Sequence, residues 1–429
     1  MTRAGWMGKI EAWPRAATLG VIAGLALMLR LLLIFALPQL GDPNSMDTAN
    51  YLHLTRSLLE SGRYAMWAKP TAYVAPVYPF FLTGVFKLCG ENLLAVKLIQ
   101  AGLGAVSVVW VYFLAIRFVR PFLALLAALI LALHPEVIGI TGFIYTETLF
   151  IFLLLATLLL LVHALTTKKA WQFLCAGALL GLTTLCRGVT LQWPVFMLPV
   201  LMLSSQRWAW LRRWAFVVTG MAVVMAPWTI RNYQRFHVFL PVATGSGDVL
   251  WTGNYLEFDG EYRYEQTQKK LFEVAGDVDL ITRDRKLTAD AKRMILEDPV
   301  AHAWLIIRKI FRYWLRVYED VPDGAARQRN WLVFGVLTFT HYAILLFALI
   351  GLWHCNRRHD GVKMLLAFVC YYTLVHAATL AVARYRIPLL PIISIAAASG
   401  VVWFMEKFFN IDPSGQKMLH FPRERSHEF

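Results

Sequence analysis

Long apolar segments alternate with short polar segments along almost the whole chain. Runs of about 18–25 apolar residues recur, which is the helix length that crosses the hydrocarbon core of a bilayer. The pattern predicts an all-α polytopic membrane protein with about ten transmembrane helices. The predicted spans are residues 17–37, 93–118, 121–133, 148–165, 171–186, 189–203, 214–228, 331–353, 365–382 and 388–409.

The polar segment at residues 38–92 has helical periodicity of its own. Apolar residues recur at helical spacing from Thr48 to Ser61, and Gly62 ends the run. Residues 79–89 are apolar but too short to span a bilayer, so we expect a juxtamembrane helix there. An acidic residue, Asp47, immediately precedes the periodic run. We therefore interpret this segment as half of an active site.

A second long polar segment covers residues 229–330 and mixes acidic with basic residues. Residues 285–297 and 300–317 have helical patterns, but the segment lacks a long apolar run, so we do not expect a separate globular domain. The predicted organisation is a single membrane domain at residues 1–409, including both polar segments, followed by a short cytoplasmic tail at 410–429.

Composition and charge support this class of protein. The chain is 58% hydrophobic and 16% charged, whereas soluble domains have about 25% charged residues. The net charge of +15 does not indicate nucleic-acid binding, because Lys and Arg fall in short loops between apolar segments. Their distribution predicts that both termini are cytoplasmic and that both polar segments are extracytoplasmic. The five cysteines show neither disulfide nor zinc-site spacing.

The predicted topology brings several ionisable residues to the extracytoplasmic surface. Charged groups at membrane depth are costly and mark function or specific pairing. Arginine and lysine can hold the phosphate of a lipid-linked substrate, and a carboxylate can accept a proton from an attacking hydroxyl. The candidates are Asp47, Lys69, Glu147, Arg187, Arg231, Arg384 and Arg386.

Most of these residues also fit a simpler explanation. Asp47 can cap the following helix, and Glu147 can interact with the dipole at the start of a span. Arg187 can be a snorkelling residue at the interface. Asp42 fits a Gly-Asp-Pro turn, and Tyr78 fits the aromatic belt of a membrane protein.

Arg384 and Arg386 are different, because they lie in a short extracytoplasmic turn against the positive-inside trend. We therefore expect each to have a carboxylate or ligand partner. His134, His341 and His376 lie near spans without ligand spacing, and we interpret them as structural.

Six groups of residues together resemble the GT-C class of membrane glycosyltransferases. The resemblance is to the glycosyltransferase family 39-like group, which includes dolichyl-phosphate-mannose-protein mannosyltransferases and bacterial aminoarabinose transferases. The motifs are Asp47-Thr-Ala-Asn-Tyr51, Ala75-Pro-Val-Tyr-Pro79, Tyr145-Thr-Glu-Thr-Leu-Phe150, Leu185-Cys-Arg187, the pair Pro227-Trp-Thr-Ile-Arg-Asn232 and Leu250-Trp-Thr-Gly-Asn254, and Arg384-Tyr-Arg-Ile-Pro388.

This resemblance implies sugar transfer from a polyprenyl-phosphate-linked donor to a lipid, glycan or protein acceptor. The family's first-loop aspartate corresponds to Asp47, which implies a base for a single displacement with inversion. The residues expected to bind the donor phosphate or substrate are Lys69, Tyr78, Glu147, Arg187, Arg231, Arg384 and Arg386. No cofactor is required, because cations can stabilise a phosphate leaving group in place of a metal; a divalent metal is the alternative. The implied location is a bacterial inner membrane.

Two other classes of function are compatible with the sequence. A transporter or flippase for lipid-linked sugars would favour an internal repeat and broken helices near the bilayer midplane, whereas the candidate charges lie at one predicted surface. A non-catalytic envelope assembly protein would not need Asp47 or the arginines. A meeting of Asp47, Arg384 and a lipid-sized groove in the folded chain would favour the enzyme, whereas a transporter should show a cavity that can open to both sides.

Overall fold

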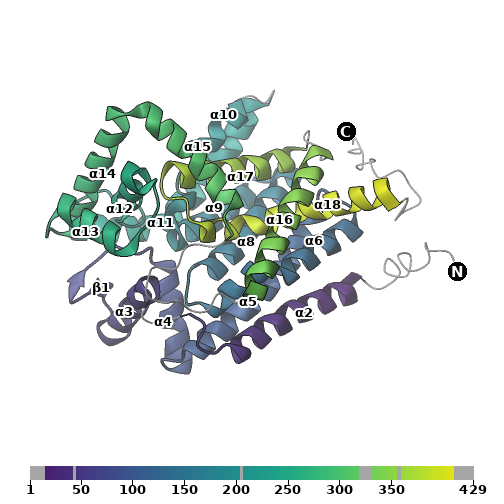
Figure 1. The fold of residues 1–429 in the computed structure, drawn as a ribbon, viewed down its shortest axis with the longest axis horizontal. Helices are drawn as coiled ribbons and strands as arrows, with labels where there is room; N and C mark the ends of the chain where they lie inside the picture. Colours follow the sequence, from purple (N-terminus) through teal and green to yellow (C-terminus); the bar gives the residue numbers. More distant parts are fainter. Residues whose placement is uncertain (1–14, 42–44, 203–205, 318–330, 355–358, 410–429) are drawn as a thin grey trace.

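The computed structural model describes residues 15–41, 45–202, 206–317, 331–354 and 359–409. These residues are almost entirely helical, as the apolar pattern predicts (Figure 1). Seven helical segments among them are long and apolar enough to cross a membrane. They are α2 (Arg15–Ala36), α5 (Leu93–Ala115), α8 (Glu147–Thr167), α11 (Arg207–Phe236), α16 (Trp331–His354), α17 (Asp360–Ala378), and η5 (Ala383–Leu389) continued by α18 (Leu390–Phe409).

The other three predicted spans are also helices, but they are shorter: α6 (Pro121–Leu133), α9 (Ala170–Cys186) and α10 (Trp193–Met202). At 1.5 Å per residue, the 13 residues of α6 reach about 20 Å, less than the hydrocarbon core. The chain then bends by 56° at Pro135 into α7 (Pro135–Gly139) and η2 (Ile140–Gly142). Counting this bent pair as one span gives eight candidate spans among the described residues.

Two pairs of helices approach each other very closely at glycines. A Cβ atom added to Gly177 of α9 would lie 2.0 Å from the carbonyl oxygen of Val217 on α11, and one added to Gly220 of α11 would lie 2.1 Å from that of Leu174. Gly351 of α16 and Gly400 of α18 likewise lie against the backbone of the partner helix. Small residues permit this backbone contact, which favours helix association in membranes.

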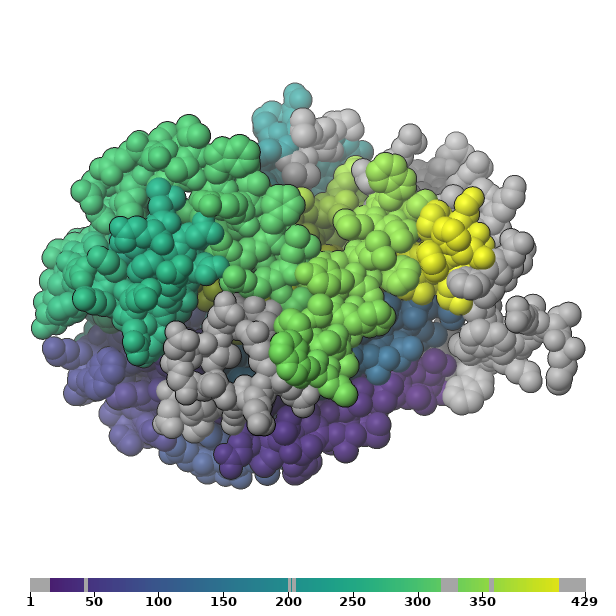
Figure 2. Space-filling view, viewed as in Figure 1, coloured from purple at the N-terminus to yellow at the C-terminus, as the bar shows by residue number. Residues whose placement is uncertain are grey.

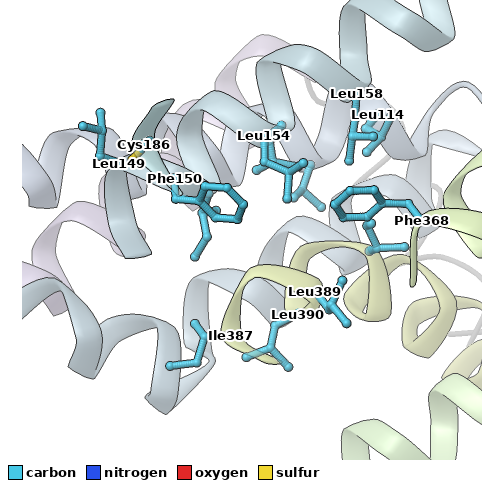
Figure 3. Packing of buried hydrophobic residues seen from close by; sticks show 14 of the residues in the cluster. Leu114, Leu149, Phe150, Leu154, Leu158, Cys186, Phe368, Ile387, Leu389 and Leu390 are labelled. Atoms are coloured by element: carbon cyan, nitrogen blue, oxygen red, sulfur yellow. The ribbon is translucent and has the colours of Figure 1, made fainter. Parts of the chain in front are cut away.

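The main apolar core lies between these helices and continues up to the first turn of α8. Phe150 and Leu154 of α8 lie across from Leu390 of α18 and Phe368 of α17 in Figure 3. Phe150 is fully buried and packs near the Tyr372 ring, with 6.4 Å between the ring centroids. Since Glu147 begins the same helix, this packing fixes the direction of the first turn of α8.

The polar segments fold at one end of the bundle, which we call the polar end (residues 45–89 and 246–315). It lies on the left of Figure 1, opposite the end where α2 begins and α18 finishes. Its elements are α3 (Met46–Ser61), β1 (Ala65–Met66), β2 (Lys69–Pro70), α4 (Val77–Cys89), α12 (Ser246–Asn254), η4 (Leu256–Phe258), α13 (Tyr264–Ala275), α14 (Leu280–Glu297) and α15 (Pro299–Leu315). The short η3 (Gly188–Thr190) follows α9.

The helices predicted at residues 48–61, 79–89, 285–297 and 300–317 are all present in the polar end. Asp279 accepts hydrogen bonds from the first backbone amides of α14, and Asp298 accepts one from the first turn of α15. These caps satisfy amides that a helix start leaves without partners. A small second apolar cluster includes Trp251, Leu271 and Leu287. In Figure 2, α14 and α15 form much of the surface at this end.

Candidate active site

Asp47 lies in the first turn of α3 and faces a residue from the opposite end of the sequence. Ser45 occupies the N-cap position, so the alternative interpretation of Asp47 as the cap is wrong. The Arg384 guanidinium donates from Nη2 to Asp47 Oδ2 at 2.7 Å. This contact confirms that Arg384 has a carboxylate partner.

Glu147 connects Arg384 to Arg187. Arg187 Nη1 donates to Glu147 Oε1 at 2.7 Å, and Arg384 Nε lies 3.2 Å from the same oxygen as an ion pair. Arg187 is therefore paired with a carboxylate, and its interpretation as only a snorkelling residue is wrong. Asp47, Arg384, Glu147 and Arg187 form a chain of alternating charges, which we call the charge chain.

Burial differs sharply along the charge chain. The side chain of Glu147 is 1% exposed, those of Arg187 and Arg384 are 15% and 27% exposed, and that of Asp47 is 41% exposed. A buried carboxylate is costly unless it is paired and hydrogen-bonded. The two guanidinium groups meet that requirement for Glu147. Asp47 is left as the more accessible of the two carboxylates.

Aromatic rings hold the two arginines in place. The Arg384 guanidinium carbon lies 4.5 Å from the ring centre of Tyr145, and that of Arg187 lies 4.9 Å from the ring centre of Tyr385. Cations are attracted to aromatic faces, and the planar guanidinium stacks well on them. The rings therefore restrict how each guanidinium can rotate.

Tyr51 lies one helical turn after Asp47 on α3, so the two residues share a face of the helix. Burial raises the pKa of the Tyr51 hydroxyl well above its ordinary value, and the nearby carboxylates of Asp47 and Glu147 raise it further. Tyr51 therefore stays neutral beside the charge chain. Its ring packs edge-on against Tyr78 at 4.9 Å.

Tyr78 of α4 contacts the ring of Tyr51. Its hydroxyl donates to Gln100 Oε1 at 2.8 Å, and the Gln100 amide donates to the carbonyl oxygens of Thr141 and Phe143. Tyr78 is fully buried, so its interpretation as an aromatic-belt residue is wrong. Its nearest link to Asp47 is the ring of Tyr51.

Arg386 lies only two residues after Arg384 but bonds to a different set of residues. Its Nη2 donates to Glu136 Oε1 at 2.8 Å, and its Nη1 donates to the carbonyl oxygen of Tyr313 at 3.1 Å. The side chain is fully buried. The predicted carboxylate partner is confirmed for Arg386 as well, and it is Glu136 rather than a member of the charge chain.

Arg231 and Lys69 belong to the region of the β1–β2 hairpin. Arg231 donates to the carbonyl oxygens of Thr71 at 2.8 Å and Tyr64 at 2.9 Å, which ties α11 to both ends of the hairpin. Lys69 is exposed on β2. The ion pairs recorded for Asp47 and Glu147 include neither Arg231 nor Lys69.

Two further expectations concern the surroundings of the site. Asp42 lies outside the described residues. Within the described part of the chain, no three or more His, Cys, Asp or Glu side chains are grouped so that they could hold a metal ion. The cations near Asp47 and Glu147 come from arginine side chains.

Comparisons with known proteins identify the fold. The chain matches the archaeal oligosaccharyltransferase AglB from Archaeoglobus fulgidus, in complex with an inhibitory peptide and a dolichol-phosphate, with a TM-score of 0.56 at 13% identity. The apo form of the Archaeoglobus fulgidus oligosaccharyltransferase matches with a TM-score of 0.54 at 16% identity. Each match covers 92% of this chain and 51% of the other. This chain has a GT-C membrane fold.

The sequence comparisons agree with the fold. Residues 70–230 match the family described as dolichyl-phosphate-mannose-protein mannosyltransferase. An undecaprenyl phosphate-alpha-4-amino-4-deoxy-L-arabinose arabinosyl transferase of Pseudomonas aeruginosa (strain LESB58) is 27% identical over 203 residues. This match covers 44% of the present chain and 36% of the relative. The GT-C chain is similar to glycosyltransferase family 39, and its matches span about a third of this relative and about half of the two solved structures above.

The family match covers two of the four residues of the charge chain. Glu147 and Arg187 lie within residues 70–230, whereas Asp47 and Arg384 lie outside it. The folded structure brings the four residues together, because α3 and η5 meet beside the start of α8.

The sequence predicted Tyr78 as a site residue, but not Tyr51, Tyr145, Tyr385 or Glu136. Tyr145 and Tyr385 lie next to selected residues in the chain, and Tyr51 is one helical turn from Asp47. Their proximity in sequence to charged candidates could have identified these tyrosines as site residues. Glu136 carries no comparable signal, because its partner Arg386 is 250 residues away.

Proposed function

We propose that this protein is an inverting glycosyltransferase. It moves a sugar from a polyprenyl-phosphate-linked donor to a lipid, glycan or protein acceptor at the extracytoplasmic membrane face. The observation that carries the proposal is the charge chain, with a partly exposed Asp47 bonded to Arg384 beside a buried Glu147–Arg187 pair. The GT-C fold supports it, as does the similarity to a transferase named for an undecaprenyl phosphate sugar.

In the proposed reaction, Asp47 acts as the general base. Arg384 bonds Asp47 at Oδ2, and we assign proton acceptance to Oδ1. The acceptor hydroxyl gives its proton to Asp47 while its oxygen attacks the anomeric carbon from the side opposite the phosphate. The bond between that carbon and the phosphate oxygen breaks, and the lipid phosphate leaves with the electron pair. One displacement of this kind inverts the configuration.

Two arginines are placed to stabilise the leaving group. The phosphate gains negative charge as the bond breaks, and preorganised cations stabilise developing charge most effectively in a site with little water. Arg384 and Arg187 both pair with Oε1 of Glu147 and are held by Tyr145 and Tyr385. We assign the phosphate to these two arginines first, with Lys69, Arg231 and Arg386 as further candidates.

The proposed orientation places the polar end outside the cell and both termini in the cytoplasm of a bacterial inner membrane. Arg15 begins α2 at the end opposite the polar end, and Lys168 and Lys169 follow α8 in the chain. Arg117 and Arg120 lie between α5 and α6. Short loops rich in Lys and Arg stay on the cytoplasmic side.

Donor turnover in lipid nanodiscs tests the proposal. Wild type and Asp47→Asn are compared on a panel of polyprenyl-phosphate sugars with membrane lipids as acceptors. We expect wild type to consume one donor and Asp47→Asn to lose activity by a factor on the order of 10²–10⁴. The control is Asp277→Asn, an exposed aspartate of the polar end outside the charge chain, which should keep full activity.

The alternatives give different results in the same assay. Turnover that survives in Asp47→Asn would contradict the assigned base while keeping the transferase. Absence of turnover in wild type for every donor would contradict the enzyme, and movement of intact donor across the bilayer would then favour a flippase.

A further inference from the structure

One helix of the polar end bonds to both ends of the short segment that carries Arg384. The segment is residues 379–386, between α17 and the middle of η5. Lys309 of α15 donates from Nζ to the carbonyl oxygen of Thr379 at 2.8 Å. The Tyr313 hydroxyl, also on α15, donates to the carbonyl oxygen of Tyr385 at 3.0 Å. The two contacts lie on either side of Arg384 in the chain.

Lys309 and Tyr313 share one face of α15, because they are four residues apart. Both side chains are fully buried. Polar groups in such surroundings are costly unless they are bonded, and the bonds that they make are to backbone carbonyls rather than to solvent. The contacts are therefore specific features of the fold.

The Lys309 contact also includes α12. Lys309 Nζ donates to the carbonyl oxygen of Gly253 at 2.6 Å, so the ammonium group joins α12 to the end of α17. Asn254 Nδ2 donates to the carbonyl oxygen of Ala378 at 3.0 Å. A Cβ atom at Gly253 would lie 1.7 Å from the Thr379 carbonyl oxygen, so only glycine allows this approach.

The Tyr313 contact is reinforced from the other side. Arg386 Nη1 donates to the carbonyl oxygen of Tyr313 at 3.1 Å and also to that of Arg316. The Tyr313 ring stacks on His376 of α17, with 5.7 Å between ring centres. The far end of the segment is thus fixed to α15 and the residue after it by three hydrogen bonds, one donated by Tyr313 and two donated by Arg386.

We propose that α15 fixes the backbone conformation of residues 379–386, a role that we call the splint. Lys309 and Tyr313 are positioning residues that keep Arg384 directed at Asp47 and Glu147. The inference rests on the proposed function for its effect on catalysis. The segment between the two contacts makes no regular α-helix until α18 begins at Leu390. Without a splint, its backbone conformations would lower the fraction of molecules with Arg384 in place.

Tyr313→Phe is the primary test, because it removes a single oxygen atom. The matched control is Tyr342→Phe, which removes a hydroxyl of α16 that donates at 2.7 Å to Leu315, at the end of the same helix. Both variants lose one tyrosine-to-carbonyl hydrogen bond with α15, but only the first loses a contact with residues 379–386.

Two measurements separate the splint from a general structural effect. In hydrogen–deuterium exchange, we expect amides of residues 379–386 to exchange faster in Tyr313→Phe and at the wild-type rate in Tyr342→Phe. In donor turnover, we expect Tyr313→Phe to lower kcat about three- to tenfold, the worth of one hydrogen bond. The KM for donor should stay within about twofold, and both variants should keep a cooperative melting transition.

Lys309→Met provides an independent second variant, with faster exchange expected at the Thr379 end of the segment. Exchange at wild-type rates in both Tyr313→Phe and Lys309→Met would overturn the splint. Equal loss of kcat in Tyr342→Phe would also overturn it. If wild type transfers no sugar, the proposed function fails while the exchange measurement still decides whether α15 holds the segment.

Discussion

At the scale of single residues, Glu147 is the most buried member of the charge chain. It is the buried carboxylate between two arginines, and both ion pairs use its Oε1. Removing one partner of a buried ion pair leaves the other charges unpaired, which costs about 3–5 kcal/mol. Asp47 is more exposed, so its substitution should affect chemistry more than stability.

Glu147→Gln should therefore lower both stability and activity. The amide keeps the shape of the side chain but leaves Arg187 and Arg384 without their shared negative partner. We expect a fall in melting temperature together with loss of donor turnover. Glu265→Gln, on the exposed surface of α13, is the control and should match wild type. A wild-type melting temperature for Glu147→Gln would show that the charge chain does not depend on this carboxylate.

At the scale of elements, helix pairing depends on glycines with different surroundings. Gly177 of α9 and Gly220 of α11 lie against the backbone of the partner helix. Gly102 of α5 has nothing within 4 Å of where its Cβ atom would be. The same substitution should therefore have opposite consequences at these positions.

Gly177→Ala should destabilise the protein by about 1–3 kcal/mol or more, because a methyl group must push α11 away. Gly102→Ala should be neutral or stabilising by up to about 1 kcal/mol, since alanine is the better helix former. Thermal unfolding in one detergent compares the two variants directly. Equal melting temperatures would contradict the close α9–α11 contact.

At the scale of the whole molecule, Lys309 joins the polar end to the bundle and has an unusual titration. Burial and, to a smaller extent, the charge of Arg312 lower its pKa from 10.5 to about 7, while Asp259 acts in the opposite direction. Between pH 7 and 10.5, the unfolded chain binds more protons at this residue than the folded protein. The free energy of unfolding therefore rises with pH across this window.

The resulting prediction is a rise in thermal stability as pH increases from 7 towards 10.5. Below pH 7 the lysine is protonated in both states, and the destabilisation is fully present. Lys309→Met should remove this contribution and flatten the pH dependence of the melting temperature. An identical pH dependence in wild type and Lys309→Met would show that the buried amine does not titrate in this range.

The sequence predicted most elements of the fold for simple physical reasons. The lengths of the apolar runs and the turn residues between them predicted ten spans and four further helical segments, and a helix is present at each. Three of the ten are shorter than a typical span: Pro121 and Pro135 bound α6, α9 has 17 residues, and α10 begins only at Trp193, after η3.

The sequence by itself determined which residues carry charge into a membrane, since a cation or carboxylate beside an apolar span is visible without a structure. It also required partners for Arg384 and Arg386. Only the tertiary structure decided that Arg384 joins Asp47, 337 residues away, whereas Arg386 joins Glu136. Two arginines separated by one residue on η5 contact different helices, and that choice depends on how α3, α7 and α8 pack around η5 rather than on local sequence.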